Sequence, residues 1–117
     1  MKFKLSVDED ILSIKTNPGI LENLIFFKNW SYRFELPMNR ISDTEVENRM
    51  GVETLVVHKS MADGDRKCIP VSINKASKRE VQFIKEALPR IIKEKLSMPK
   101  IKELQNEYLS HSNAVYL

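Results

Sequence analysis

The chain has 117 residues, of which 42% are hydrophobic and 30% charged, a size and composition that fit one globular domain and exclude wholesale disorder. Its single cysteine excludes an intrachain disulfide, and no apolar run approaches the roughly 20 residues that span a bilayer, so we expect a cytoplasmic protein with no membrane partner. The net charge is only +3, but residues 74–117 carry nine Lys and Arg against five Asp and Glu. The excess of positive charge therefore lies in the C-terminal third.

Near the N-terminus, residues 3–7 alternate between apolar and polar side chains, which predicts a strand with one buried face. Residues 11–15 form either a second strand of a hairpin or a loop. Asn17 as N-cap and Pro18 in the first turn then predict a short helix that ends near Asn29.

Residues 30–36 alternate strictly and predict the clearest strand, which Pro37 ends. Trp30, Tyr32 and Phe34 share one face of it. We interpret this face as the core side, because Ser, Arg and Glu make the other side polar. The alternative is an exposed aromatic platform on which nucleic-acid bases stack.

Residues 43–50 carry the end signals of a helix. Ser42 and Glu45 match a capping box, and Gly51 fits the left-handed position after a helix. We therefore predict a surface helix over residues 43–50.

Two runs rich in β-branched residues, 53–60 and 67–73, flank a turn that contains Asp63 and Gly64. This pattern predicts a β-hairpin. Pro70 removes a hydrogen-bond donor, so its strand should lie at a sheet edge or contain a bulge.

A helix is predicted over residues 77–96, because Ser77 and Glu80 match a capping box and apolar residues follow at helical spacing. The apolar series is Val81, Ile84, Leu88, Ile91 and Ile92. Pro89 should kink or split this helix, and a further helix is predicted over residues 99–109.

The predicted fold is a single α+β domain over residues 1–110, followed by a tail at 111–117. It has an approximately four-stranded, mainly antiparallel sheet, two short helices and a Pro-kinked C-terminal helical arm that packs on the sheet.

The first functional hypothesis is a small, non-catalytic regulatory module that binds nucleic acid, DNA or RNA. Lys and Arg displace counterions from nucleic acid, and at 100° per residue six of them lie opposite the apolar face of the helix. These six are Lys75, Lys78, Arg79, Lys85, Arg90 and Lys93. The alternative interpretation is that long basic side chains merely solvate a packed helix.

The second hypothesis is a protein-binding regulator or inhibitor, which includes a homodimer. Its contact surface would be the arm with Ile101, Leu104 and Tyr108, or the edge strand around Pro70.

An enzyme is the least favoured hypothesis, and we expect no catalytic residues, metal or cofactor. Counting across the predicted hairpin places His58 nearly opposite Cys68, as a nucleophile pair or half of a metal site would require. We interpret Cys68 instead as a small core residue. Carboxylates at residues 8–10 and 63–65 are interpreted as solvated turns, and the chain has no Gly-rich phosphate loop.

Overall fold

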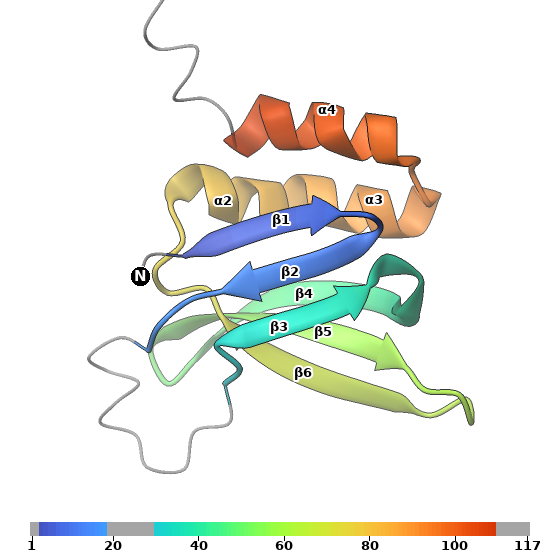
Figure 1. The fold of residues 1–117 in the computed structure, drawn as a ribbon. Helices are drawn as coiled ribbons and strands as arrows, with labels where there is room; N and C mark the ends of the chain where they lie inside the picture. Colours follow the sequence, from blue (N-terminus) through green and yellow to red (C-terminus); the bar gives the residue numbers. More distant parts are fainter. Residues whose placement is uncertain (1–2, 19–29, 110–117) are drawn as a thin grey trace, which may run out of the picture.

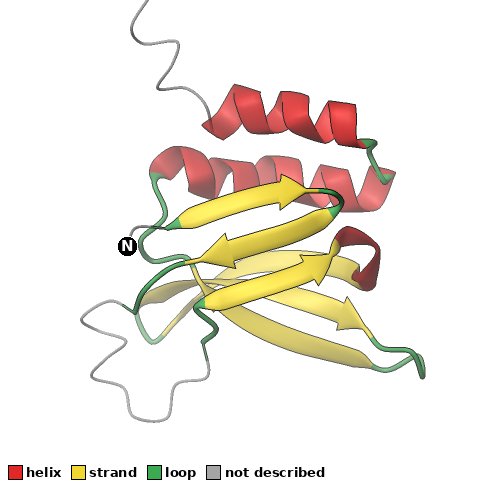
Figure 2. Cartoon of the chain, in the orientation of Figure 1, coloured by secondary structure: helices red, strands yellow, loops and turns green. Residues whose placement is uncertain are grey.

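The computed structural model describes residues 3–18 and 30–109, which form an α+β fold with two three-stranded antiparallel sheets and a long helix. Figure 1 shows the helices stacked above the sheets, and Figure 2 separates helices from strands by colour. The predicted helix that ends near Asn29 and the predicted tail at 111–117 lie outside the described residues, apart from Asn17 and Pro18, which are not helical.

The first sheet has the strand order β1–β2–β3, with bounds Lys4–Asp8, Ile11–Lys15 and Arg33–Pro37. Glu9 and Asp10 connect β1 to β2, and both have positive φ angles, 51° and 61°. Two consecutive positive φ angles define the primed turn that matches the twist of a hairpin. The structure therefore confirms the hairpin rather than the loop.

The second sheet has the order β4–β5–β6, with bounds Ile41–Arg49, Val52–Ser60 and Arg66–Ser72. The predicted hairpin is β5 with β6, and it is confirmed. Pro70 lies in β6, which is an edge strand of this sheet, as predicted.

The prediction of a helix over residues 43–50 is wrong, because this segment is β4. Met50 and Gly51 have φ angles of 54° and 86°, so the glycine serves a hairpin turn between β4 and β5 instead of a helix end. The hydroxyl of Ser42 donates to the carbonyl of His58, 3.0 Å away, and caps no helix. Pairing with β5 outweighs the local helix signals.

The prediction of about four strands in one sheet is also wrong, since the described residues contain six strands in two sheets. The two sheets meet where Ser31, which precedes β3, forms a parallel bridge with Val71 of β6. Backbone bonds from Ser31 to Pro70 and from Ser72 to Ser31 hold this junction, at 2.7 Å and 3.3 Å.

The long helix packs on the hydrophobic core that it shares with both sheets. It runs through α2 (Lys78–Gln82), a π-helical turn η2 (Phe83–Ala87) and α3 (Leu88–Glu94). Ser77 and Glu80 form the predicted capping box. Pro89 is predicted to kink or split this helix. The split does not occur, because the wide π turn just before the proline accommodates its missing N–H and the helix continues.

A turn at Lys95, whose φ angle is 50°, ends α3 and leads into α4, Met98–Leu109, close to the predicted 99–109. α3 packs against β4, while α4 packs against β1 and the first half of the long helix. One hydrophobic cluster joins both sheets to η2, α3 and α4; it includes Leu12, Phe34, Leu55, Val71, Phe83, Leu88, Ile101 and Leu104. No helix among residues 3–18 and 30–109 has the length and apolarity needed to cross a membrane.

Candidate functional site

All six predicted nucleic-acid-binding residues are exposed, namely Lys75, Lys78, Arg79, Lys85, Arg90 and Lys93. Lys75 precedes the long helix and the other five lie on it. They do not form one uniform surface, because some of these side chains are engaged within the chain.

Arg79 has a structural role that its spacing does not reveal. Its Nε donates to the carbonyl of Tyr108 at 3.0 Å, and one Nη donates to the carbonyl of Glu107 at 2.9 Å. Both carbonyls belong to the last turn of α4, where helix carbonyls lack intrahelical partners. Arg79 therefore ties α2 to the end of α4.

The π turn changes which residues of the helix share a side. One extra residue in a turn rotates everything after it by roughly 100° relative to an α-helix. With that rotation, Lys78, Lys85, Arg90 and Lys93 fall within an arc of roughly 60°, whereas a regular α-helix would turn Arg90 well away from Lys85. Arg90 also pairs with Glu94 at 3.5 Å, an exposed contact four residues along that is weak enough to exchange for another anion. We call Lys78, Lys85, Arg90 and Lys93 the basic face.

The arm predicted to bind a protein partner is largely used within the chain. Ile101 and Leu104 are 1% and 6% exposed and belong to the hydrophobic core. Tyr108 is half-buried, stacks edge-on against Phe83 with ring centroids 5.9 Å apart, and donates to Glu86 at 3.1 Å. These three side chains leave little apolar surface for a partner.

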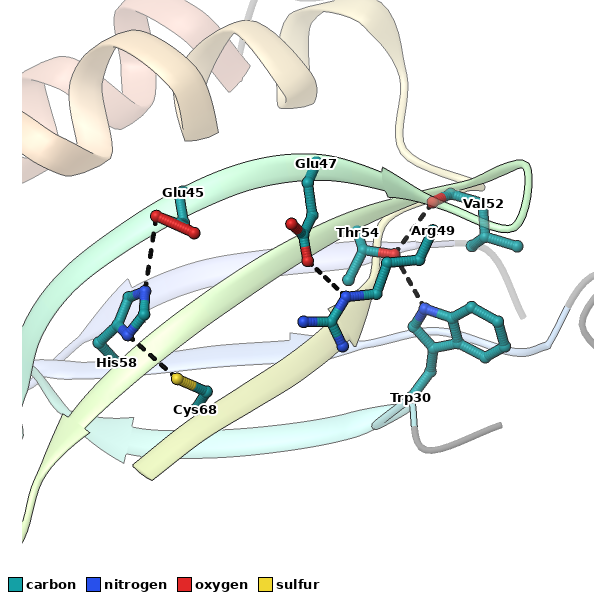
Figure 3. A network of polar contacts seen from close by, with 8 residues as sticks. All are labelled: Trp30, Glu45, Glu47, Arg49, Val52, Thr54, His58 and Cys68. Carbon is teal, nitrogen blue, oxygen red and sulfur yellow. Dashed lines mark hydrogen bonds and ion pairs between the residues drawn. The ribbon is translucent and has the colours of Figure 1, made fainter. Parts of the chain in front are cut away.

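Of the predicted aromatic face, Phe34 turns inward, as the preferred interpretation expected, but Trp30 does not. Phe34 is buried, and its neighbour Leu36 is buried too. Trp30 is half-buried and lies over the second sheet, where its Nε1 donates to Thr54 Oγ1 at 2.8 Å (Figure 3). This arrangement offers no open stacking platform for bases.

On the outer face of the second sheet, the structure brings together three side chains from three adjacent strands. His58 and Cys68 are directly opposite each other in the β5–β6 register, as counting across the hairpin predicted. Cys68 Sγ lies 3.2 Å from His58 Nδ1, and Glu45 Oε2 lies 3.7 Å from His58 Nε2. Figure 3 shows the imidazole ring between the carboxylate and the sulfur. We call these residues the thiol triad.

The interpretation of Cys68 as a core residue is wrong, because it is exposed. β6 is an edge strand, and the face that carries Cys68 is the one turned away from the main core. Glu45 was not foreseen as its partner, since it lies on a segment predicted to be helical. Once β4 is recognised as a strand, Glu45 falls diagonally across from His58, two residues beyond its direct partner Asp43.

Asp43, although directly opposite His58 in the register, bonds to its own strand: its carboxylate accepts from the backbone N–H of Thr44 at 2.8 Å. The two ring nitrogens of His58 point to different partners, so the triad does not converge on one point as metal ligands do. Among the described residues, no three His, Cys, Asp or Glu side chains are grouped to hold a metal ion.

Two concave surfaces were not apparent from the sequence. One, of about 760 Å³, opens beside the β1–β2 turn, and its lining includes Ile11, Met38, Ile92, Leu96 and Met98. The other is a groove of about 500 Å³ between β3 and β6; it is lined by Ser31, Arg33, Phe34, Glu35, Leu36, Lys59, Lys67, Cys68, Ile69 and Pro70. Each lining comes from segments far apart in the chain, so no local pattern predicts it.

Comparisons with protein-family models, with curated proteins and with solved structures found no match. The protein's function must therefore be inferred from the chemistry of its own residues.

Proposed function

We propose that the protein is a small non-catalytic binding module that contacts nucleic acid through the basic face, Lys78, Lys85, Arg90 and Lys93. The observation that carries the proposal is the π turn at Phe83–Ala87, which aligns these four exposed cations along one side of a continuous helix. A row of exposed cations on a rigid helix can follow successive phosphates and release their counterions.

Arg79 leaves the proposed contact set, because its guanidinium caps the carbonyl end of α4. Lys75 stays at the margin, since it is exposed but precedes the helix. Phe34 on β3 is buried and Trp30 is half-buried, which favours contacts with the phosphate backbone over base stacking. Binding should therefore depend strongly on salt and weakly on sequence.

The test is retention of single- and double-stranded DNA and RNA at increasing salt. Wild-type protein should bind with a steep salt dependence, losing roughly 100-fold in affinity between 50 and 200 mM salt if all four cations contact phosphates. The variant Lys78→Glu, Lys85→Glu, Lys93→Glu should lose this binding.

The matched control is Lys4→Glu, Lys100→Glu, Lys102→Glu, which makes the same change in net charge at three exposed lysines away from the basic face. It should keep most of the affinity. Equal losses in the two triple variants would contradict the proposal, because they would show that net charge alone attracts the nucleic acid. Absence of binding by wild-type protein at low salt would also overturn it.

A further inference from the structure

We propose a second site, independent of the basic face: Cys68 is a thiol–disulfide exchange site that forms a mixed disulfide with a small-molecule disulfide. The site is the thiol triad on the outer face of the second sheet. Two features of the structure carry this inference, and each concerns one requirement of the exchange reaction.

The first requirement is a base for the thiol proton, because the thiolate is the nucleophile in disulfide exchange. His58 Nδ1 is 3.2 Å from Cys68 Sγ, within reach of that proton. Nδ1 can accept it when the ring carries its own hydrogen on Nε2. That nitrogen faces Glu45 Oε2 at 3.7 Å, so the carboxylate stabilises the imidazolium that forms. Glu45 thus acts as a positioning residue.

The second requirement is access for the incoming disulfide, and Cys68 meets it because its side chain is exposed on an edge strand. In the exchange, the Cys68 thiolate attacks one sulfur of the small disulfide and a new S–S bond forms. The original S–S bond breaks, and its other sulfur leaves as a thiolate that takes the proton from His58. The Cys68 sulfur is oxidised and the leaving sulfur is reduced, so no further oxidant is needed.

The reaction stops at the mixed disulfide, because Cys68 is the only cysteine in the chain. No second thiol of the same molecule can displace the bound group. Release therefore needs an external thiol, so the site behaves as a reversible modification site and not as a catalyst of disulfide formation.

The test uses oxidised glutathione as the probe and follows the mixed disulfide by intact mass spectrometry at pH 7. His58→Gln should slow the reaction between about threefold and thirtyfold, because an unassisted thiol is only a few per cent thiolate at this pH. Glu45→Gln should slow it less. Glu47→Gln is the matched control, since this residue is on the same strand but pairs with Arg49.

The pH dependence of the rate separates assistance by His58 from a change in structure. The wild-type rate should decline slowly below pH 7, whereas the His58→Gln rate should fall about tenfold per pH unit, as for a free thiol. Asp43 and Glu45 from β4 and Arg66 from β6 also face the His58–Cys68 pair and are unchanged in that variant.

An unchanged rate in His58→Gln would overturn the proposal, as would equal rates for wild-type protein in buffer and in denaturing urea. Reaction with hydrogen peroxide but not with oxidised glutathione would overturn the exchange chemistry itself.

Discussion

At the scale of single residues, neighbours on the long helix have different tasks although their sequence pattern groups them. Arg79 holds the last carbonyls of α4, whereas Lys78 and Lys85 contribute to the basic face. Arginine suits the first task because its planar guanidinium can donate to two carbonyl oxygens together. Residue type and charge alone do not distinguish the two tasks.

Tyr108 provides a pH-dependent prediction at this scale. Partial burial, the hydrogen bond to Glu86 and the charge of that carboxylate raise the pKa of Tyr108 above its usual value of 10.0. The unfolded chain therefore releases this proton at lower pH than the folded chain does. The contribution of Tyr108 to stability is complete below pH 10 and is lost as pH rises through the folded pKa.

We expect Tyr108→Phe to lose less stability than wild-type protein between pH 9 and pH 11, as measured by urea unfolding. Glu86→Gln should behave similarly, because it removes the carboxylate that opposes the phenolate. The comparison with wild-type protein cancels the pH effects that all three proteins share. Parallel losses in wild type and Tyr108→Phe would contradict this assignment.

At the scale of elements, the fold closes the exposed edge of its first sheet with a side chain. Among the strands that the structure describes, β1 pairs only with β2, and α4 packs against it. The side-chain amide of Gln105 accepts from the N–H of Val7 at 3.1 Å and donates to the carbonyl of the same residue at 2.9 Å. Gln105 therefore occupies the hydrogen-bonding groups that a further strand would use.

We expect Gln105→Ala to reduce the free energy of unfolding by about 1–3 kcal/mol, because it leaves two backbone groups of Val7 without their partners. Urea unfolding measures this change. Glu103→Ala, at an exposed position of the same helix, should change stability by no more than about 0.5 kcal/mol. Equal stability of the two variants would mean that the two hydrogen bonds of the Gln105 side chain make no net contribution to the free energy of unfolding. Increased self-association of Gln105→Ala would further show that the edge is protected.

At the scale of the whole molecule, one hydrophobic cluster contacts both sheets and the helices, so the domain should unfold as one unit. Leu88 is fully buried at the centre of the long helix. The single tryptophan, Trp30, lies instead on the outer face of the second sheet. A change at Leu88 therefore perturbs the helix side of the core, whereas the fluorescence of Trp30 follows the unfolding of the second sheet.

We expect Leu88→Ala to reduce stability by about 2–5 kcal/mol. Tryptophan fluorescence and far-ultraviolet circular dichroism should show the same lowered urea midpoint. The exposed Lys93→Ala serves as the control and should leave the midpoint nearly unchanged. A fluorescence midpoint that does not move with the circular dichroism would mean that the sheet and the helices unfold separately.

The sequence by itself determined the elements whose signals are local. Alternation predicted the strand that became β3, β-branched runs around a turn predicted β5 and β6, and capping residues with helical spacing predicted the long helix and α4. The same counting placed His58 opposite Cys68. Each of these inferences depends on residues within one or two adjacent elements, where the chain's own periodicity sets the geometry.

Only the tertiary structure decided the features that depend on distant partners. Pairing with β5 made residues 41–49 a strand although Ser42, Glu45 and Gly51 favour a helix, and that strand brought Glu45 to His58. The π turn before Pro89 determines which cations share a face of the helix, and the carbonyls at the end of α4 bind the Arg79 side chain. The physical reason is that hydrogen bonding and burial between remote segments outweigh local preferences of a few tenths of a kcal/mol per residue.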